Sequence, residues 1–212
     1  MKILSFILIA LFVSCNQRIN VKKQSASDNS QIETTLKDDQ QILVEKEKAS
    51  IEKNIDSLGD LISKIEFKVK TNNFDDYKEG YIPWITIEHP DNDLKQLIDK
   101  DKIVINENKV TVIVDYPLTN EYRFDLISNH GFTKDQLVKE ISKNYHKIYE
   151  EEETTATIKT IPIDKRTTMY NRNETNGKYG IWGHDLADLV LADILVYKTK
   201  NGQIILSLEM ES

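Results

Sequence analysis

Apolar and polar positions alternate in several short runs of the chain, and this two-residue period predicts β-strands. Ile65, Phe67 and Val69 are separated by charged residues, as in a strand that buries one face. Similar runs predict strands at residues 81–88 and 121–127. Pro83 lies near the start of the first of these runs, which favours an edge strand because proline has no N–H to donate to a neighbour.

Two pairs of apolar runs are close enough along the chain to form β-hairpins. Residues 190–198 and 203–209 flank Asn201-Gly202, a dipeptide that favours the tight turns of hairpins. Residues 103–105 and 110–116 flank a short polar segment and are predicted to pair in the same way. Hairpins join antiparallel strands, so both pairs indicate an antiparallel sheet.

The clearest helical pattern begins at Thr133. Thr133 and Gln136 have the spacing of a capping box, in which each side chain bonds to the backbone N–H of the other residue. Apolar residues then recur every three or four positions and share one helix face: Leu137, Val138, Ile141, Tyr145 and Ile148. We expect an amphipathic helix packed on the sheet, ending in the acidic run 150–153.

Residues 35–64 show a second helical pattern, with a single apolar stripe and no proline. Lys48 interrupts the stripe, which is continuous only from Ile51 onward. One interpretation is a coiled-coil arm that self-associates or binds a protein partner. We favour the other, a long helix that packs its C-terminal half on its own domain, because the stripe is short for a coiled coil.

These elements together predict an α+β fold. Its sheet is mainly antiparallel and contains hairpins, with one long N-terminal helix over residues 35–64 and one amphipathic helix on the sheet. The globular domain is expected to span residues 65–212, a length that suits a single hydrophobic core.

The N-terminus shows neither the two-residue period of a strand nor the three-to-four-residue period of an amphipathic helix. Lys2 precedes an apolar run over residues 3–13, too short to cross a bilayer and typical of a secretory signal peptide. Phe12-Val13-Ser14-Cys15 resembles the lipobox of bacterial lipoproteins, with Phe12 in place of the more usual leucine. Cys15 is the one cysteine of the chain. The alternative is an ordinary secretory peptide that leaves Cys15 as an odd thiol.

The resemblance implies that residues 1–14 are removed and that Cys15 receives fatty acyl chains such as palmitate. Several such chains hold a protein on a membrane almost permanently, since each buried methylene contributes about 0.8 kcal/mol. Asn16 follows the cysteine where aspartate marks retention in the inner membrane, so the resemblance favours the outer membrane, and we lean towards its periplasmic face. Residues 15–34 are almost entirely polar and are expected to form a flexible tether.

Composition excludes several classes of function. With 28 basic and 35 acidic residues the formal net charge is −7, which makes nucleic acid and an anionic lipid surface poor partners. No second cysteine is present for a disulfide or a cysteine-based zinc site. Phosphate-binding loops, dinucleotide fingerprints, nucleophile elbows and EF-hand loops are also absent, and no metal or cofactor is expected.

Candidate chemistry is concentrated in residues 173–188, a glycine-rich polar stretch. His184, Asp185 and Asp188 could supply a general base or a metal ligand. Tyr179 and Trp182 could form a stacking surface for a small ligand. The structural alternative, which we favour, is that Trp182 anchors the loop in the core while Asp185 caps a short helical turn.

The sequence leaves the molecular function open. Our first hypothesis is a lipid-anchored envelope protein whose domain is a non-enzymatic interaction or binding module. The alternative is an envelope hydrolase that uses His184 and Asp185. A cleft that holds His184 beside further ionisable groups would favour the enzyme, whereas a buried histidine with backbone contacts alone would argue against it.

Overall fold

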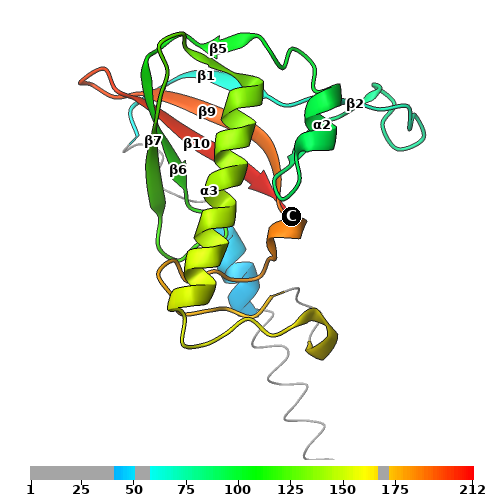
Figure 1. Cartoon of the computed structure of the whole chain (residues 1–212), viewed down its shortest axis with the longest axis vertical. Coiled ribbons are helices and arrows are strands. Elements are labelled where there is room, and N and C mark those ends of the chain that lie inside the picture. Colours follow the sequence, from blue (N-terminus) through cyan, green and yellow to red (C-terminus); the bar gives the residue numbers. More distant parts are fainter. Residues whose placement is uncertain (1–40, 51–57, 167–171) are drawn as a thin grey trace, which may run out of the picture. The chain divides into compact units, whose positions relative to one another are not determined.

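The computed structural model describes residues 41–50, 58–166 and 172–212, and all of them belong to one compact unit, Asp39–Ser212. The fold is α+β, as predicted (Figure 1). Its main sheet has the strand order β1-β9-β10-β6-β7, and β4 pairs with β9 beside this path. These strands are β1 (Asp60–Glu66), β4 (Ile85–Thr86), β6 (Lys109–Val114), β7 (Tyr122–Ile127), β9 (Val190–Lys198) and β10 (Ile204–Glu211).

The C-terminal hairpin is confirmed and forms the centre of the sheet. β9 and β10 pair antiparallel from Ile204–Lys198 to Glu211–Val190. Gly202 in the connecting turn has a φ of 83°, a conformation that glycine adopts without steric cost. Their inward residues Ile194, Val196 and Leu206 are at most 2% exposed, because they belong to the core formed with the elements packed on this face of the sheet.

The other predicted hairpin is wrong. Residues 103–105 form β5 (Ile103–Ile105), which pairs antiparallel with β8 (Phe132–Thr133) rather than with β6. β6 pairs antiparallel with β7 and parallel with β10. The sheet is thus mainly antiparallel with one parallel pair. A parallel pair needs a long connection, so spacing along the chain could not reveal it.

Helix α3 (Lys134–Thr155) covers one face of the sheet (Figure 1). Its capping box is formed as predicted, with the Thr133 hydroxyl accepting from Gln136 N and the Gln136 side chain accepting from Thr133 N. The predicted apolar face is confirmed, since Leu137, Ile141 and Tyr145 are fully buried. Their burial against the strands supplies the main stabilisation of a helix of this length.

Smaller elements complete the unit at either end of α3. β2 (Val69–Lys70) and β3 (Tyr81–Ile82) form a short antiparallel pair, followed by α2 (Asp91–Gln96). Single 3-10 turns, η2 (Ile163–Lys165) and η3 (Leu186–Asp188), lie in the segments after α3.

The prediction for residues 35–64 is wrong at its C-terminal end. Residues 41–50 are helical, but Asp60–Glu66 is strand β1, paired antiparallel with β9. Leu58 packs on the sheet face opposite α3, beside Ile113, Tyr197 and Ile205. A stripe with helical spacing and a bulged strand can carry the same apolar residues, and strand pairing decided between them. Residues 35–40 and 51–57 lie outside the described residues, as do the predicted leader and tether.

Candidate functional site

The predicted functional loop is fixed between three elements. Ile181 forms a bridge with Leu118, and Thr119 N donates to Gly180 O over 3.0 Å. A second bridge joins Arg172 to Gly183. The segment 172–188 therefore lies against the turn that follows β6, next to the C-terminal end of α3 and the helical residues 41–50.

His184 links this segment to the helical residues 41–50. Its Nε2 lies 2.8 Å from Glu47 Oε1, and the Tyr116 hydroxyl donates to the same oxygen over 2.9 Å. The ring stacks on Tyr116 at a centroid distance of 5.5 Å, and its side chain is 13% exposed. Its contacts thus include a carboxylate and a ring, more than the backbone bonds of a purely structural histidine.

The described residues around His184 do not form a catalytic triad. Ser212 Oγ lies 3.5 Å from His184 Nε2, so a serine, a histidine and a carboxylate do meet. In a triad the carboxylate holds Nδ1 and leaves Nε2 to the serine. Here Glu47 and Ser212 both approach Nε2, whereas buried Nδ1 has no hydrogen-bond partner among the described residues. The serine therefore has no free base to accept its proton.

Asp185 is held by two guanidinium groups. Arg166 contacts both its carboxylate oxygens, at 2.5 and 3.1 Å, and Arg172 Nη1 lies 3.4 Å from Oδ1. Arg172 is itself 7% exposed and lies over the ring of Tyr149. The charge of Asp185 is neutralised within the fold, and no described contact joins its side chain to that of His184.

Asp188 and the backbone complete this arrangement. The Asp188 carboxylate accepts from Asp185 N over 2.9 Å, at the start of η3. The Tyr149 hydroxyl donates to His184 O over 2.9 Å. Burial raises the pKa of Tyr149, so this hydroxyl keeps its proton. Asp185 does begin the short helical turn. The side chains of His184 and Asp185 contact Glu47 and Arg166 from other segments, whereas that of Asp188 bonds within the loop.

Tyr179 and Trp182 are both core residues. They are 2% and 4% exposed, which confirms that Trp182 anchors the loop. Tyr179 packs edge-on against Tyr122, and its hydroxyl donates to Glu151 over 2.5 Å. Trp182 packs edge-on against Tyr116. The two rings do not form one stacking surface.

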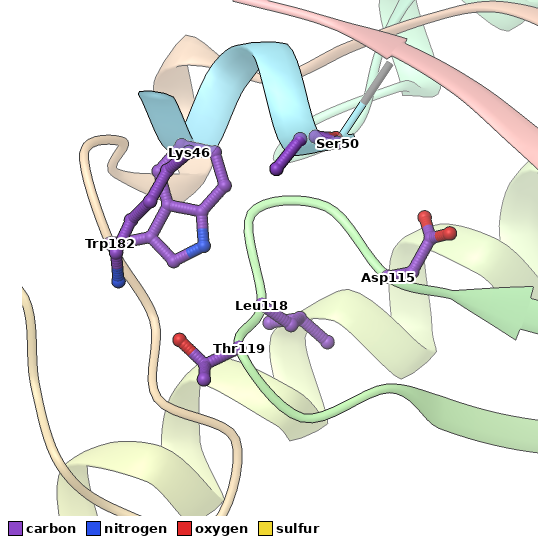
Figure 2. Close-up of a pocket in the computed structure, with 7 residues that line it drawn as sticks. Lys46, Ser50, Asp115, Leu118, Thr119 and Trp182 are labelled. Carbon is purple, nitrogen blue, oxygen red and sulfur yellow. The ribbon is translucent and has the colours of Figure 1, made fainter. Parts of the chain in front are cut away.

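Trp182 lines a pocket, shown in Figure 2. The pocket has a volume of about 190 Å³. Trp182 and Leu118 form its apolar walls, and Lys46 extends from the helical residues across the indole, 5.8 Å from the ring centroid. Ligand pockets commonly measure about 300–1,000 Å³. This pocket accommodates a single side chain or a group of that size.

Glu152 is the residue that sequence analysis missed. Its carboxylate is fully buried at the end of α3 and accepts four hydrogen bonds, from Thr175 Oγ1, Gly177 N, Tyr179 N and Gly180 N, over 2.7–3.1 Å. Burial alone would raise its pKa, but these bonds outweigh it and lower the pKa. The available signal was an acidic run followed by a loop with closely spaced glycines.

Within residues 41–50, 58–166 and 172–212, no group of three or more histidine, cysteine or acidic residues is placed to hold a metal ion. None of the helices described there is both long and apolar enough to cross a membrane. Cys15 lies outside the described residues.

No protein-family model matches the chain, and neither a curated protein nor a solved structure is significantly similar to it. Its function must therefore be argued from its own residues.

Proposed function

We propose that this chain is a lipid-anchored protein of the bacterial cell envelope whose folded unit is a non-enzymatic interaction or binding module. The support for the anchor is the apolar run over residues 3–13 followed by Phe12-Val13-Ser14-Cys15. Asn16 supports the outer membrane as the destination, and the periplasmic face remains the side towards which we lean.

One observation supports a binding module over an enzyme. Each predicted catalytic side chain, His184, Asp185 and Asp188, forms contacts within the protein itself. Asp185 is neutralised by Arg166 and Arg172, and His184 Nε2 lies against Glu47. A general base needs an accessible lone pair aimed at a substrate. A hydrolase that uses His184 and Asp185 would have to break both contacts first, so the geometry supports binding better than hydrolysis.

The pocket beside Trp182 supports a protein partner rather than a free small ligand. Its volume of about 190 Å³ suits one inserted side chain, the way anchor residues enter pockets at protein interfaces. Ala49 and Leu118 also line it, which favours an apolar side chain. The helical residues 41–50 form one wall, and their Ile42 and Val44 are 51% and 64% exposed. These exposed residues would serve self-association through the same helix.

Replacement of Cys15 by serine tests the anchor. We expect wild-type protein to sediment with the outer membrane and Cys15→Ser to appear in the soluble fraction, since the acyl chains supply the membrane affinity. Asn16→Asp is the matched control, because it keeps the acylated cysteine and is expected to move the protein to the inner membrane. A Cys15→Ser protein that sediments with membranes although residues 1–14 have been removed would refute lipid attachment.

Replacement of His184 by alanine distinguishes the proposed binding module from the alternative hydrolase. We expect His184→Ala to lower the free energy of unfolding by about 1–2 kcal/mol, since it removes the Glu47 contact and the ring stacked on Tyr116. Urea denaturation measures the loss. Unchanged stability combined with lost hydrolysis of a cell-envelope substrate would favour the enzyme instead.

A further inference from the structure

A second site lies at the opposite end of α3 from the segment 172–188. A groove with a volume of about 490 Å³ runs between β1, β5 and the first residue of α3. Four lysines line it, together with two acidic residues: Lys64, Lys68, Lys102, Lys134, Glu66 and Asp99. This local excess of positive charge contrasts with the formal net charge of −7 for the chain.

Two of the lysines are paired with carboxylates of the protein. Lys68 Nζ lies 2.9 Å from Glu66 Oε2, and Lys64 Nζ lies 2.9 Å from Asp193 Oδ2. Lys64 also approaches Glu66 at 3.7 Å. These two ammonium groups are therefore largely neutralised.

Lys102 and Lys134 have no such partner. Among the described residues, no carboxylate lies within 4 Å of either amine. Lys134 Nζ instead donates to Glu66 O over 2.7 Å, which fixes its position on the groove wall. Asp99 lies in the groove without forming an ion pair to them. Two lysines without a carboxylate partner within 4 Å thus line one groove, and an ammonium group has three hydrogen-bond donors.

Burial disfavours the charged form of Lys134, and an anion in the groove would offset this effect. Burial lowers its pKa, and the nearby charges of Lys102 and Lys68 lower it further, against the opposing effect of Asp99. Like charges that share a cavity destabilise one another unless an anion lies between them.

We propose that this groove binds a phosphate group through Lys102 and Lys134. A phosphate is negatively charged at neutral pH, opposite to the net positive charge that remains when Asp99 is counted against Lys102 and Lys134, and lysine binds phosphate as a compact point charge. Ser63 also lines the groove and adds a hydroxyl donor. The phosphate belongs either to a soluble phosphate ester or to the headgroup of an anionic lipid. This site is independent of the function proposed above.

Titration of the full chain with inorganic phosphate tests the site, followed by calorimetry or by the NMR signals of lysine. We expect saturable binding that Lys102→Gln with Lys134→Gln weakens at least tenfold, since each charged hydrogen bond contributes about 1.5 kcal/mol or more. We also expect bound phosphate to raise the pKa of Lys134. Lys143→Gln is the matched control for Lys102→Gln alone, because each removes one positive charge from an exposed position.

Lys102→Gln alone keeps the test valid if the loss of Lys134 disturbs folding, because Lys102 is exposed on a turn. An arm with phosphatidylcholine vesicles, with and without phosphatidylglycerol, compares the groove variants in a Cys15→Ser background. Weaker vesicle binding in the variants identifies the lipid headgroup, and weaker binding of free phosphate alone identifies a soluble ester. Absence of both kinds of binding, or an equal loss in Lys143→Gln, overturns the proposal.

Discussion

At the scale of single residues, Glu152 shows how a charge can be buried without a counter-ion. Its carboxylate is fully buried, and the backbone N–H groups of a loop supply three of its four hydrogen bonds. Gly177 makes this possible, since a Cβ there would lie 2.7 Å from the carboxylate. The acidic run at the end of α3, unfavourable to the helix dipole, is thus used to attach the loop.

Replacement of Glu152 by glutamine tests this attachment. The amide would present N–H donors to backbone N–H groups, so we expect a loss of about 3 kcal/mol in the free energy of unfolding. Urea denaturation measures it. Glu150→Gln on the exposed side of the same run is the control and should change stability by less than about 0.5 kcal/mol. Equal losses of unfolding free energy in the two variants would show that the buried hydrogen bonds of Glu152 do not stabilise the fold.

At the scale of elements, the helical residues 41–50 are joined to the loop 172–188 by side chains on one face. Glu47 contacts His184 and Tyr116, Lys46 pairs with Glu174 at 2.5 Å, and Leu43 packs against the core. Burial raises the pKa of Tyr116, so its hydroxyl remains a donor to Glu47. The described contacts of this helix lie at residues 43–47, and residues 51–57 of the predicted docking face lie outside the described residues.

Replacement of Glu47 by alanine tests the docking. We expect amide hydrogen exchange within residues 41–50 to become several-fold faster, since Tyr116 and His184 both lose their shared acceptor. Global stability should fall by about 1 kcal/mol. Glu45→Ala is the matched control, because Glu45 contacts only Gln41 on the exposed side of the same helix among the contacts described. Unchanged exchange in Glu47→Ala would show that other contacts hold the helix.

At the scale of the whole molecule, the carboxylates determine how stability depends on pH. The pKa of Glu152 is lowered despite burial, and hydrogen bonds to Lys68 and Lys109 lower the pKa values of Glu66 and Asp125. Groups with lowered pKa values stabilise the fold above their unfolded pKa, and that contribution is lost as pH falls through the folded value. Glu209 acts in the opposite sense, since partial burial and Asp193 raise its pKa.

We therefore expect the wild-type protein to lose stability as pH falls below about 4.5, the ordinary value for glutamate. Urea midpoints at a series of pH values measure the effect. The Glu152→Gln variant should lose less on acidification, because its main acid-sensitive group is already absent. If the urea midpoints of the two proteins depend on pH in the same way, groups other than Glu152 cause the loss of stability in acid.

The sequence by itself determined the elements whose signals are local. The capping box at Thr133, the apolar face of α3 and the turn at Asn201-Gly202 depend on residues a few positions apart, and all three are present as predicted. The α+β class follows from them. The lipobox resemblance at Cys15 is equally local and stays a prediction.

Only the tertiary structure decided what depends on distant partners. The partner of β5 could not be predicted from the sequence, because β8 lies far along the chain. Residues 60–64 form part of a strand because they pair with β9. His184 and Asp185 are neighbours in sequence, yet their side chains have different partners, Glu47 and Arg166. Long-range contacts carry most of the burial energy, so where they compete with local patterns they prevail.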